Sequence, residues 1–259
     1  MARQNLQFEV EEEIGLATFD RQPALNTLDA QTLEELAEVV GEVERGAARA
    51  LILTGAGDRA FVAGADVAEL ARMSAAGARR FAERGHAVLE RLERLPVPTV
   101  AAVNGHALGG GCELALACDL VYASERARFG VPEVGLGIVP GFGGSQRLPR
   151  RVGQMRALEL LLTGEPVDAG RALALGLVLE VLPPDRLLPH ARQQASKVLA
   201  RGPLAVAQVK RLVHAGAGLS LSAACELERQ GFAELFATED AREGLRAFLE
   251  KRPPRFRGA

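Results

Sequence analysis

The chain has 259 residues, of which 48 % are hydrophobic and 25 % are charged, and its formal net charge is −2. This composition is typical of a globular protein, and the nearly neutral charge argues against a broad attraction to nucleic acid or to an acidic membrane. No apolar run is long enough to cross a bilayer and no basic-then-apolar leader opens the chain, so we expect a cytoplasmic protein without a membrane partner. Three cysteines and four histidines show neither a disulfide framework nor metal-ligand spacing, so we expect no metal site.

The first two thirds of the chain alternate between strand-like and helix-like patterns. Apolar residues recur at helical spacing after Asp29, which suits a helix N-cap, and again between Phe81 and Leu95. Strands that alternate with helices in this way indicate the α/β fold class. The predicted strands are short apolar runs bounded by turn residues, at 6–12, 15–19, 50–54, 99–103, 120–123 and 176–182.

Past residue 185 the strand signals stop and only helical patterns follow. They predict helices over residues 189–201, 203–215, 220–236 and 239–251, the last of which ends before two prolines. We therefore expect two parts. Residues 1–195 would form an α/β core that holds the functional site, and residues 196–259 would form a helical segment.

The most informative feature is the absence of charge from two windows of 18 residues. Residues 101–118 contain one carboxylate, Glu113, and residues 129–146 contain one charged residue, Glu133. At 25 % charged residues, a window of this length would hold about four or five. Both windows therefore have the composition of buried segments, and each of them retains a single acid.

A buried carboxylate is costly unless it is paired, hydrogen-bonded or protonated. Glu113 and Glu133 are therefore candidates for acid–base catalysis. For either residue alone, the alternative is a structural glutamate that accepts backbone N–H groups at the start of a helix. Two such windows close together in the chain favour a catalytic function.

Glycines provide a second element of a site. Residues 109–111 are three glycines that precede an apolar, helix-like run, and the start of a helix offers free N–H groups that suit an oxyanion. By itself, a triple glycine more often marks a tight turn. A second stretch rich in glycine and alanine, residues 61–66, also leads into a helix. There Asp66 and Glu69 fit a capping box, and we prefer this role of Asp66 to a catalytic one.

Several familiar motifs are excluded. Residues 141–146 end in glutamine where a dinucleotide fingerprint needs glycine or alanine, and residues 143–147 end in arginine where a nucleophile elbow needs glycine. No phosphate-binding loop of the GxxxxGK[ST] type occurs. His106 fits the wall of a site better than a catalytic base, and Cys112 and Cys118 fit small core residues.

Together these residues resemble the crotonase family, and most closely its enoyl-CoA hydratases. The resemblance covers essentially the whole chain and implies a crotonase-like α/β core, a spiral of ββα repeats, with a C-terminal helical segment for oligomerisation. The similar segments follow the family's order and spacing: AFVAGADVAEL (60–70), AAVNGHALGGGCELALACDLVYAS (101–124), FGVPEVGLGIVPGFGGSQRLPRRVG (129–153), LLLTGEPVDAGRALALGLV (160–178) and AFLEKRPPRF (247–256).

The resemblance also implies the roles of individual residues. The backbone N–H groups of Ala65 and Gly110 would form an oxyanion hole for the thioester carbonyl, and Glu113 and Glu133 would hold one water over the double bond. Relatives often carry lysine where this chain has Ala68, which leaves a phosphate contact there open. The residues that would contact the substrate or its coenzyme A are Ala63, Gly64, Asp66, Val67, Ala68, Gly109, Gly141 and, at the nucleotide end and often from a neighbouring subunit, Phe232 and Lys251.

The implied activity is reversible hydration of trans-2-enoyl-CoA to 3-hydroxyacyl-CoA, as in fatty acid β-oxidation. The acyl-CoA thioester would be the substrate, with no separate cofactor, and the assembly would be a homotrimer or a hexamer. Two carboxyl groups around one water cannot easily both be ionised, so a pair that shares one proton would supply both the acid and the base.

Two other activities stay open. One is double-bond isomerisation of an enoyl-CoA, although many isomerases of the family keep an acid at the position of Glu133 and not at that of Glu113. The other is RNA binding, which is reported for some family members. The net charge of −2 and the lack of a lysine-rich helix argue against a nucleic-acid partner.

Overall fold

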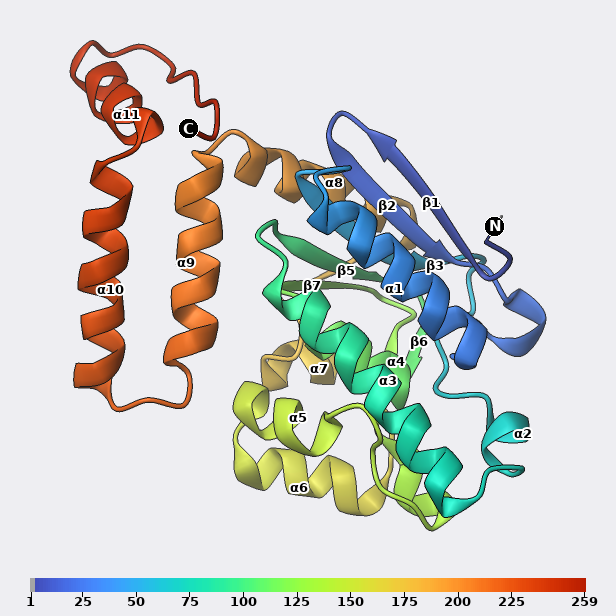
Figure 1. Ribbon diagram of the computed structural model, residues 1–259. Helices are drawn as coiled ribbons and strands as arrows, with labels where there is room; N and C mark the ends of the chain where they lie inside the picture. The colour runs from blue at the N-terminus through green and yellow to red at the C-terminus, as the bar shows by residue number, and fades with distance from the viewer. Residues whose placement is uncertain (1–2) are drawn as a thin grey trace.

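The structure, a computed structural model, describes residues 3–259 and contains a large and a small β-sheet (Figure 1). The large sheet has the strand order β1-β2-β3-β5-β7-β10. β1 and β2 form an antiparallel hairpin, whereas all later neighbours pair in parallel and are joined by crossover connections. The strand bounds are Leu6–Glu11, Ile14–Phe19, Ala50–Gly55, Thr99–Val103, Leu120–Ser124 and Glu180–Leu182.

Helices cover both faces of the large sheet. The α-helices and 3-10 helices (η) of the core are η1 (Gln22–Ala24), α1 (Ala30–Glu44), α2 (Val67–Leu70), α3 (Ala75–Arg94), α4 (Gly110–Leu116), η2 (Pro132–Leu136), α5 (Gly144–Val152), α6 (Gln154–Thr163), α7 (Ala169–Leu175) and α8 (Pro184–Leu199). Side chains of a strand alternate between the two faces. Leu51 and Leu53 of β3 therefore pack in the cluster that includes α1 and α3, while Ile52 packs in the cluster that includes α8. Burial on both faces explains why these strands are continuous apolar runs in the sequence.

The small sheet is built from short strands, of which β4, β6 and β8 each follow a strand of the large sheet, whereas β9 follows α6. It has the order β4-β6-β8-β9, with bounds Ala60–Val62, His106–Leu108, Arg128–Gly130 and Val167–Asp168. The order of a long strand, a short strand and then a helix recurs along the chain, as in β5-β6-α4 and β7-β8 followed by η2. Each repeat therefore returns the chain to the small sheet just before a helix begins. The sequence does not predict these strands, because segments of two or three residues show no periodicity.

The last three helices form an arm, defined here as residues 203–259. They are α9 (Pro203–Gly216), α10 (Leu221–Phe236) and α11 (Glu239–Leu249). Figure 1 shows α9 and α10 as an antiparallel pair beside the core, with α11 folded over one end of the pair. Lys210 joins α9 to the core: its Nζ lies 2.7 Å from Oδ2 of Asp119 and donates to the carbonyl of Val97.

Most predicted elements are confirmed. The first five predicted strands coincide with β1, β2, β3, β5 and β7 to within one residue at each end, and Asp29 caps α1 by accepting a hydrogen bond from the Thr32 N–H. The prediction of one strand over residues 176–182 was wrong. Gly176, with a φ of 77°, ends α7, and only residues 180–182 pair, as β10. Residues 177 and 178 are buried in the intervening turn, and their apolar character resembles that of a strand.

The helix predicted to start at residue 189 starts instead at Pro184, and Pro189 lies inside it. Proline suits the first turn of a helix, where its missing N–H would have no partner, and the prediction chose the wrong proline. α8 also crosses the predicted boundary at residue 195. Its buried residues pack on the large sheet. The division into residues 1–195 and 196–259 stays a prediction.

Candidate active site

The candidate site is built around the turn between β6 and α4. Gly109 in this turn has a φ of 48° and a ψ of −123°, a conformation that residues with a Cβ rarely adopt. A Cβ on Gly109 would also lie 2.7 Å from Oε1 of Glu133, so this carboxyl group rests directly against the backbone of the turn. The Gly109 N–H donates to the carbonyl of Gly130, which ties the turn to β8. The first of the three glycines is therefore required both by its conformation and by a close approach.

Glu113 lies in the first turn of α4, and only 1 % of its surface is exposed. Its Oε1 accepts two backbone hydrogen bonds, from the Phe142 N–H at 2.8 Å and from the Gly144 N–H at 2.6 Å. Among residues 3–259, no group donates a hydrogen bond to Oε2 of Glu113. The carboxyl group is thus held through one oxygen, while the other stays available to a bound molecule.

Glu133 is half-buried in the first turn of η2. Its Oε2 is buried and has no hydrogen-bond partner within the described part of the chain. Buried polar atoms without partners are rare and costly in folded proteins, and they are typical of sites where a ligand supplies the missing partner. Glu133 therefore has the environment of a functional carboxyl group.

Both carboxyl groups ionise less readily than a free glutamate. Burial raises the pKa of Glu113 to about 7, and the negative charge of Glu133 also raises it, although the hydrogen bonds from Gly144 and Phe142 act in the opposite direction. Burial raises the pKa of Glu133 as well. Two neighbouring carboxyl groups with raised pKa values can hold one proton between them, and such a pair would offer an acid and a base together.

In the described part of the chain, two backbone N–H groups near this pair have no acceptor. Leu28 forms a parallel bridge with Ala65, in which the Leu28 N–H donates to the Gly64 carbonyl and the Asp66 N–H donates to the Leu28 carbonyl. This bridge does not use the N–H of Ala65. Within residues 3–259, no acceptor is bonded to the Ala65 N–H.

The N–H of Gly110 is likewise unused in the described structure, because Gly110 is the first residue of α4 and has no acceptor one turn earlier. The segment that carries Ala65 touches this turn. The Cα of Gly64 lies 3.6 Å from the place that a Cβ on Gly109 would take. The fold thus brings two free donors close to the two carboxyl groups, as an oxyanion hole requires.

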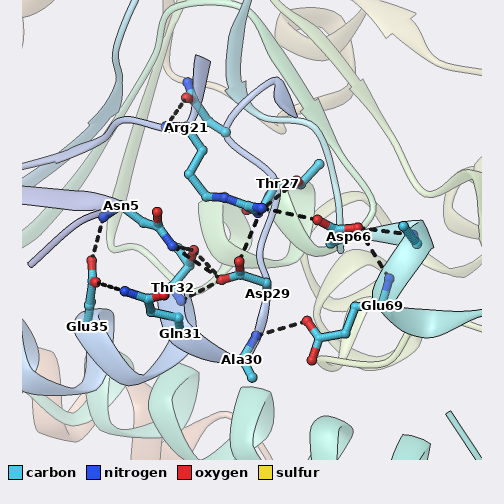
Figure 2. Close-up of polar contacts among 12 residues, drawn as sticks. Asn5, Arg21, Thr27, Asp29, Ala30, Gln31, Thr32, Glu35, Asp66 and Glu69 are labelled. Carbon is cyan, nitrogen blue, oxygen red and sulfur yellow. Dashed lines mark hydrogen bonds and ion pairs between the residues drawn. The ribbon is translucent and has the colours of Figure 1, made fainter. Parts of the chain in front are cut away.

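A polar network, shown in Figure 2, holds the segment around Ala65 in place. One nitrogen of Arg21, Nη2, lies 3.2 Å from Oδ2 of Asp29 and 3.2 Å from Oδ2 of Asp66. The other terminal nitrogen, Nη1, donates to the carbonyl of Thr27 at 2.9 Å. Arg21 therefore clamps the start of α1 to the start of α2. Burial opposes ionisation of Asp66, but the hydrogen bond from Arg21 keeps its pKa below the usual value.

The predicted capping role of Asp66 is confirmed. Its Oδ1 accepts hydrogen bonds from the N–H groups of Ala68 and Glu69 at the start of α2. The reciprocal bond of a capping box does not form. The side chain of Glu69 instead accepts from the Ala30 N–H at 3.1 Å, so it connects α2 to α1 (Figure 2).

The other predicted site residues fall into two groups. Ala63, Gly64, Val67 and Ala68 flank Ala65, and Gly141 precedes the loop that binds Glu113. A hollow of about 380 Å³ opens at this place, lined by Asp29, Asp66, Ala68, Glu69, Arg72 and Met73. Phe232 and Lys251 lie on the arm, away from α4 (Figure 1), and Phe232 is 65 % exposed. A single chain therefore assembles the predicted carboxyl and N–H groups, but not the two arm residues.

Sequence reasoning missed the donors that hold Glu113. The only signal is the glycine-rich run 141–144, and nothing in the pattern links it to a residue about thirty positions earlier. It also missed Arg147, whose guanidinium donates to the carbonyl of Phe142 and pairs with Glu93. In the sequence Arg147 lies close to Arg150 and Arg151, and no pattern distinguishes it from them.

Other reactive side chains lie outside this arrangement. Cys112 and Cys118 are buried, as predicted, and burial raises the pKa of the Cys112 thiol to about 12. Within residues 3–259, no three His, Cys, Asp or Glu side chains are grouped so as to hold a metal ion, and no helix is long and apolar enough to span a membrane.

Comparison with known proteins identifies the class to which this fold and site belong. A family model described as enoyl-CoA hydratase/isomerase matches residues 9–259. The chain belongs to this family. Its α/β core of ββα repeats with a helical C-terminal part is the crotonase fold, as the sequence predicted.

Individual relatives are similar over almost their full length. A short-chain-enoyl-CoA hydratase of Clostridium acetobutylicum is 45 % identical over 253 residues, which cover 97 % of each chain. A crotonyl-CoA hydratase of Syntrophomonas wolfei is 45 % identical over 257 residues, which cover 99 % of each chain. The crystal structure of an enoyl-CoA hydratase from Bacillus anthracis superposes with a TM-score of 0.95 at 39 % identity, covering 99 % of this chain and all of that one.

The geometry predicts that the pKa of Glu113 depends on its neighbour. Glu133→Gln removes a nearby negative charge, so the pKa of Glu113 should fall below about 7. The measurement is a ¹³C NMR titration of glutamate-labelled protein, with the Glu113 signal assigned from its loss in Glu113→Gln. Glu165→Gln, a change at an exposed glutamate, should leave the titration unchanged. An unchanged or higher pKa of Glu113 in Glu133→Gln would show that the two groups do not interact.

Proposed function

We propose that the protein catalyses the reversible hydration of trans-2-enoyl-CoA thioesters to 3-hydroxyacyl-CoA. The observation that carries this proposal is the proximity of the buried carboxyl group of Glu113 and the half-buried one of Glu133 to the N–H groups of Ala65 and Gly110, which have no acceptor among residues 3–259. Addition of water to a conjugated thioester needs a base, an acid and a place for negative charge on the carbonyl oxygen. Membership of the enoyl-CoA hydratase/isomerase family supports the same chemistry.

The N–H groups of Ala65 and Gly110 would receive the thioester oxygen. They polarise the carbonyl, and they bind most strongly when attack at C3 turns the thioester into an enolate. Because both donors belong to backbone that is already fixed, little reorganisation is needed when the charge develops. Each donor of this kind contributes about 10²–10³-fold in rate.

The two carboxyl groups would share one proton and bind one water. The ionised carboxylate accepts a proton from the water while the water oxygen bonds to C3, and the protonated carboxyl group then gives its proton to C2. The elements of water are thereby added across the double bond, and the pair again holds one proton. The raised pKa of Glu113, about 7, supports a carboxyl group that still carries a proton near neutral pH.

We propose short-chain enoyl-CoA thioesters as the preferred substrates. The two relatives at 45 % identity are named for short-chain enoyl-CoA and crotonyl-CoA, which supports this preference. The proposed reaction involves no change of oxidation state overall, and coenzyme A enters as part of the substrate, so no separate cofactor takes part.

Replacing either glutamate by glutamine should lower the hydration rate by at least about 10²-fold, because one half of the proton-sharing pair is lost. Glu113→Gln with Glu133→Gln should cost much less than the product of the two single effects, since both groups act on one water. The measurement is steady-state hydration of trans-2-enoyl-CoA thioesters from C4 to C16, with the trans-3 isomers assayed in parallel. A Glu113→Gln protein that hydrates normally but no longer isomerises would show that isomerisation is the main reaction.

A change at Gly110 tests the oxyanion hole. Gly110→Pro removes the N–H, and proline is tolerated at the first position of a helix, so turnover should be abolished while the protein still folds. Gly110→Ala is the matched control, because it adds a Cβ to the same site but keeps the donor. Its kcat should stay far above that of Gly110→Pro, and CoA-thioester binding should change less than kcat in both. Full turnover by a folded Gly110→Pro protein would refute the role of this N–H group.

We further propose that the arm mediates assembly into homotrimers, alone or paired as hexamers, and that Phe232 and Lys251 complete the coenzyme site of a neighbouring subunit. The support is apolar surface on the arm. Few of its side chains are buried, and the exposed ones include Val209, Val213, Leu221, Phe232, Phe236, Leu245, Phe248 and Leu249. So much exposed apolar surface is typical of an interface with another chain.

Light scattering of the full-length protein at assay concentration should therefore give the mass of three or six chains of 27.5 kDa. Phe232→Ala should then raise the KM for the CoA thioester more than it lowers kcat, because it is remote from the reacting atoms. A fully active monomer would contradict both the assembly and the shared coenzyme site.

A further inference from the structure

The position of Glu113 depends on a loop that is rich in glycine, residues 141–144. Among the described residues, Oε1 of Glu113 is held only by the N–H groups of Phe142 and Gly144, so the place of the loop determines where the other oxygen, Oε2, lies. Residues 141–144 contain three glycines, and Gly143 has a φ of 100°. Glycine-rich backbone loses more conformational freedom on folding than other backbone, so a loop of this kind needs contacts that fix it.

Arg147 supplies such a contact from the first turns of α5. Its Nε and Nη2 form a bidentate ion pair with Glu93, at 2.6 and 2.8 Å, and its Nη1 donates to the carbonyl of Phe142 at 2.5 Å. The guanidinium also fills the space beside Gly143, where a Cβ would lie 2.2 Å from Nη1. Both partners are largely withdrawn from solvent, with side chains 14 % and 24 % exposed.

The other partner, Glu93, belongs to α3, and the same helix holds the loop at a second point. The Phe142 ring packs 5.3 Å from that of Phe81, and one of its atoms would lie 2.1 Å from a Cβ on Gly85. The ring therefore occupies the place of a side chain at Gly85. α3 thus binds the loop through a ring at one end and through Glu93 and Arg147 two turns further on.

We propose that Arg147 and Glu93 are positioning residues for the catalytic carboxyl group of Glu113. The ion pair fixes the Phe142 carbonyl, the peptide geometry of the loop fixes the N–H groups of Phe142 and Gly144, and these fix Oε1 of Glu113. A largely buried ion pair is a weak source of stability in itself, because desolvation offsets much of the attraction. Nη1 of Arg147, however, donates to the Phe142 carbonyl, so the ion pair can hold the loop in the position that aligns Glu113. This inference rests on the proposed hydration reaction.

The test replaces Arg147 by methionine, which keeps an unbranched apolar stem but removes the charge and all donors. A misplacement of about 1 Å can cost about 10²-fold in rate, so kcat for hydration of crotonyl-CoA should fall by about that factor while KM changes less than about threefold. The pKa of Glu113, measured by ¹³C NMR, should rise above about 7, because both the guanidinium and the N–H donors favour its ionised form. Arg147→Lys should recover little of the loss, because an ammonium group cannot form the fork.

Arg150→Met is the matched control. Arg150 lies on the same helix and is exposed, and within residues 3–259 it donates only to the carbonyl and the side chain of Gln146 on that helix, so kcat and the pKa of Glu113 should stay close to wild type. Glu93→Gln is the second variant. It leaves Arg147 bonded to the Phe142 carbonyl and should lower kcat in the same direction by a smaller factor. Combined with Arg147→Met, it should add little further loss, because the two residues act as one unit.

The outcomes separate this inference from the proposed function. A folded Arg147→Met protein with kcat within about threefold of wild type and an unchanged pKa of Glu113 would overturn the positioning role. If Arg147→Met does not fold, Glu93→Gln decides, and wild-type kcat with an unchanged pKa would overturn it. If the wild-type protein hydrates no enoyl-CoA, the proposed function fails. The NMR titration still tests the link from Arg147 to Glu113, because it needs no activity.

Discussion

The hydrogen bonds from Phe142 and Gly144 to one oxygen of Glu113 are the interaction on which the rest of the site depends. They hold a carboxyl group that is almost completely buried without neutralising it. Burial raises its pKa to about 7, whereas the two donors limit that rise. Without the donors, the group would pay the full cost of desolvation in its ionised form. With them, it can ionise or carry a proton within the range of pH in which enzymes work.

The arrangement of the sheets explains how these groups meet. Each repeat of the core returns the chain to the small sheet, and the helices and loops that follow β4, β6 and β8 carry Ala65, Gly110 and Glu133 in turn. The strands of this sheet are short, yet their pairing fixes the position at which each following helix or loop begins. The site is therefore formed by backbone that is supported by regular structure, which suits groups that must be placed to within a fraction of an ångström.

The arm, unlike the core, buries few of its side chains within the chain. α9 and α10 pack on each other, and α9 is joined to the core by Lys210 and Asp119, but few of the arm's side chains are buried. Exposed apolar surface on this scale costs free energy in water, and contact with another chain would remove that cost. The proposed assembly therefore connects the stability of the arm with the completion of the coenzyme site.

The sequence by itself predicted much of the core and singled out the two acids, Glu113 and Glu133, that the proposal uses. Strands buried on both faces appear as continuous apolar runs, and single carboxylates in otherwise uncharged windows stand out because burial excludes charge. The resemblance to a family, carried by segments such as residues 101–153, added the N–H groups of Ala65 and Gly110. These signals are local in the chain, and local composition records burial directly.

Only the tertiary structure decided what surrounds those residues. The donors to Glu113 lie about thirty positions after it, and Glu93 lies more than fifty positions before Arg147, so no periodicity connects them. The short strands of the small sheet were missed for a related reason. Their conformation is set by pairing and packing with distant segments, whereas a sequence pattern reports only neighbours within a few turns of helix or strand. The burial of a residue such as Glu113 can be inferred from its neighbours in the sequence, but the residues that hold it in place are brought to it only by the fold.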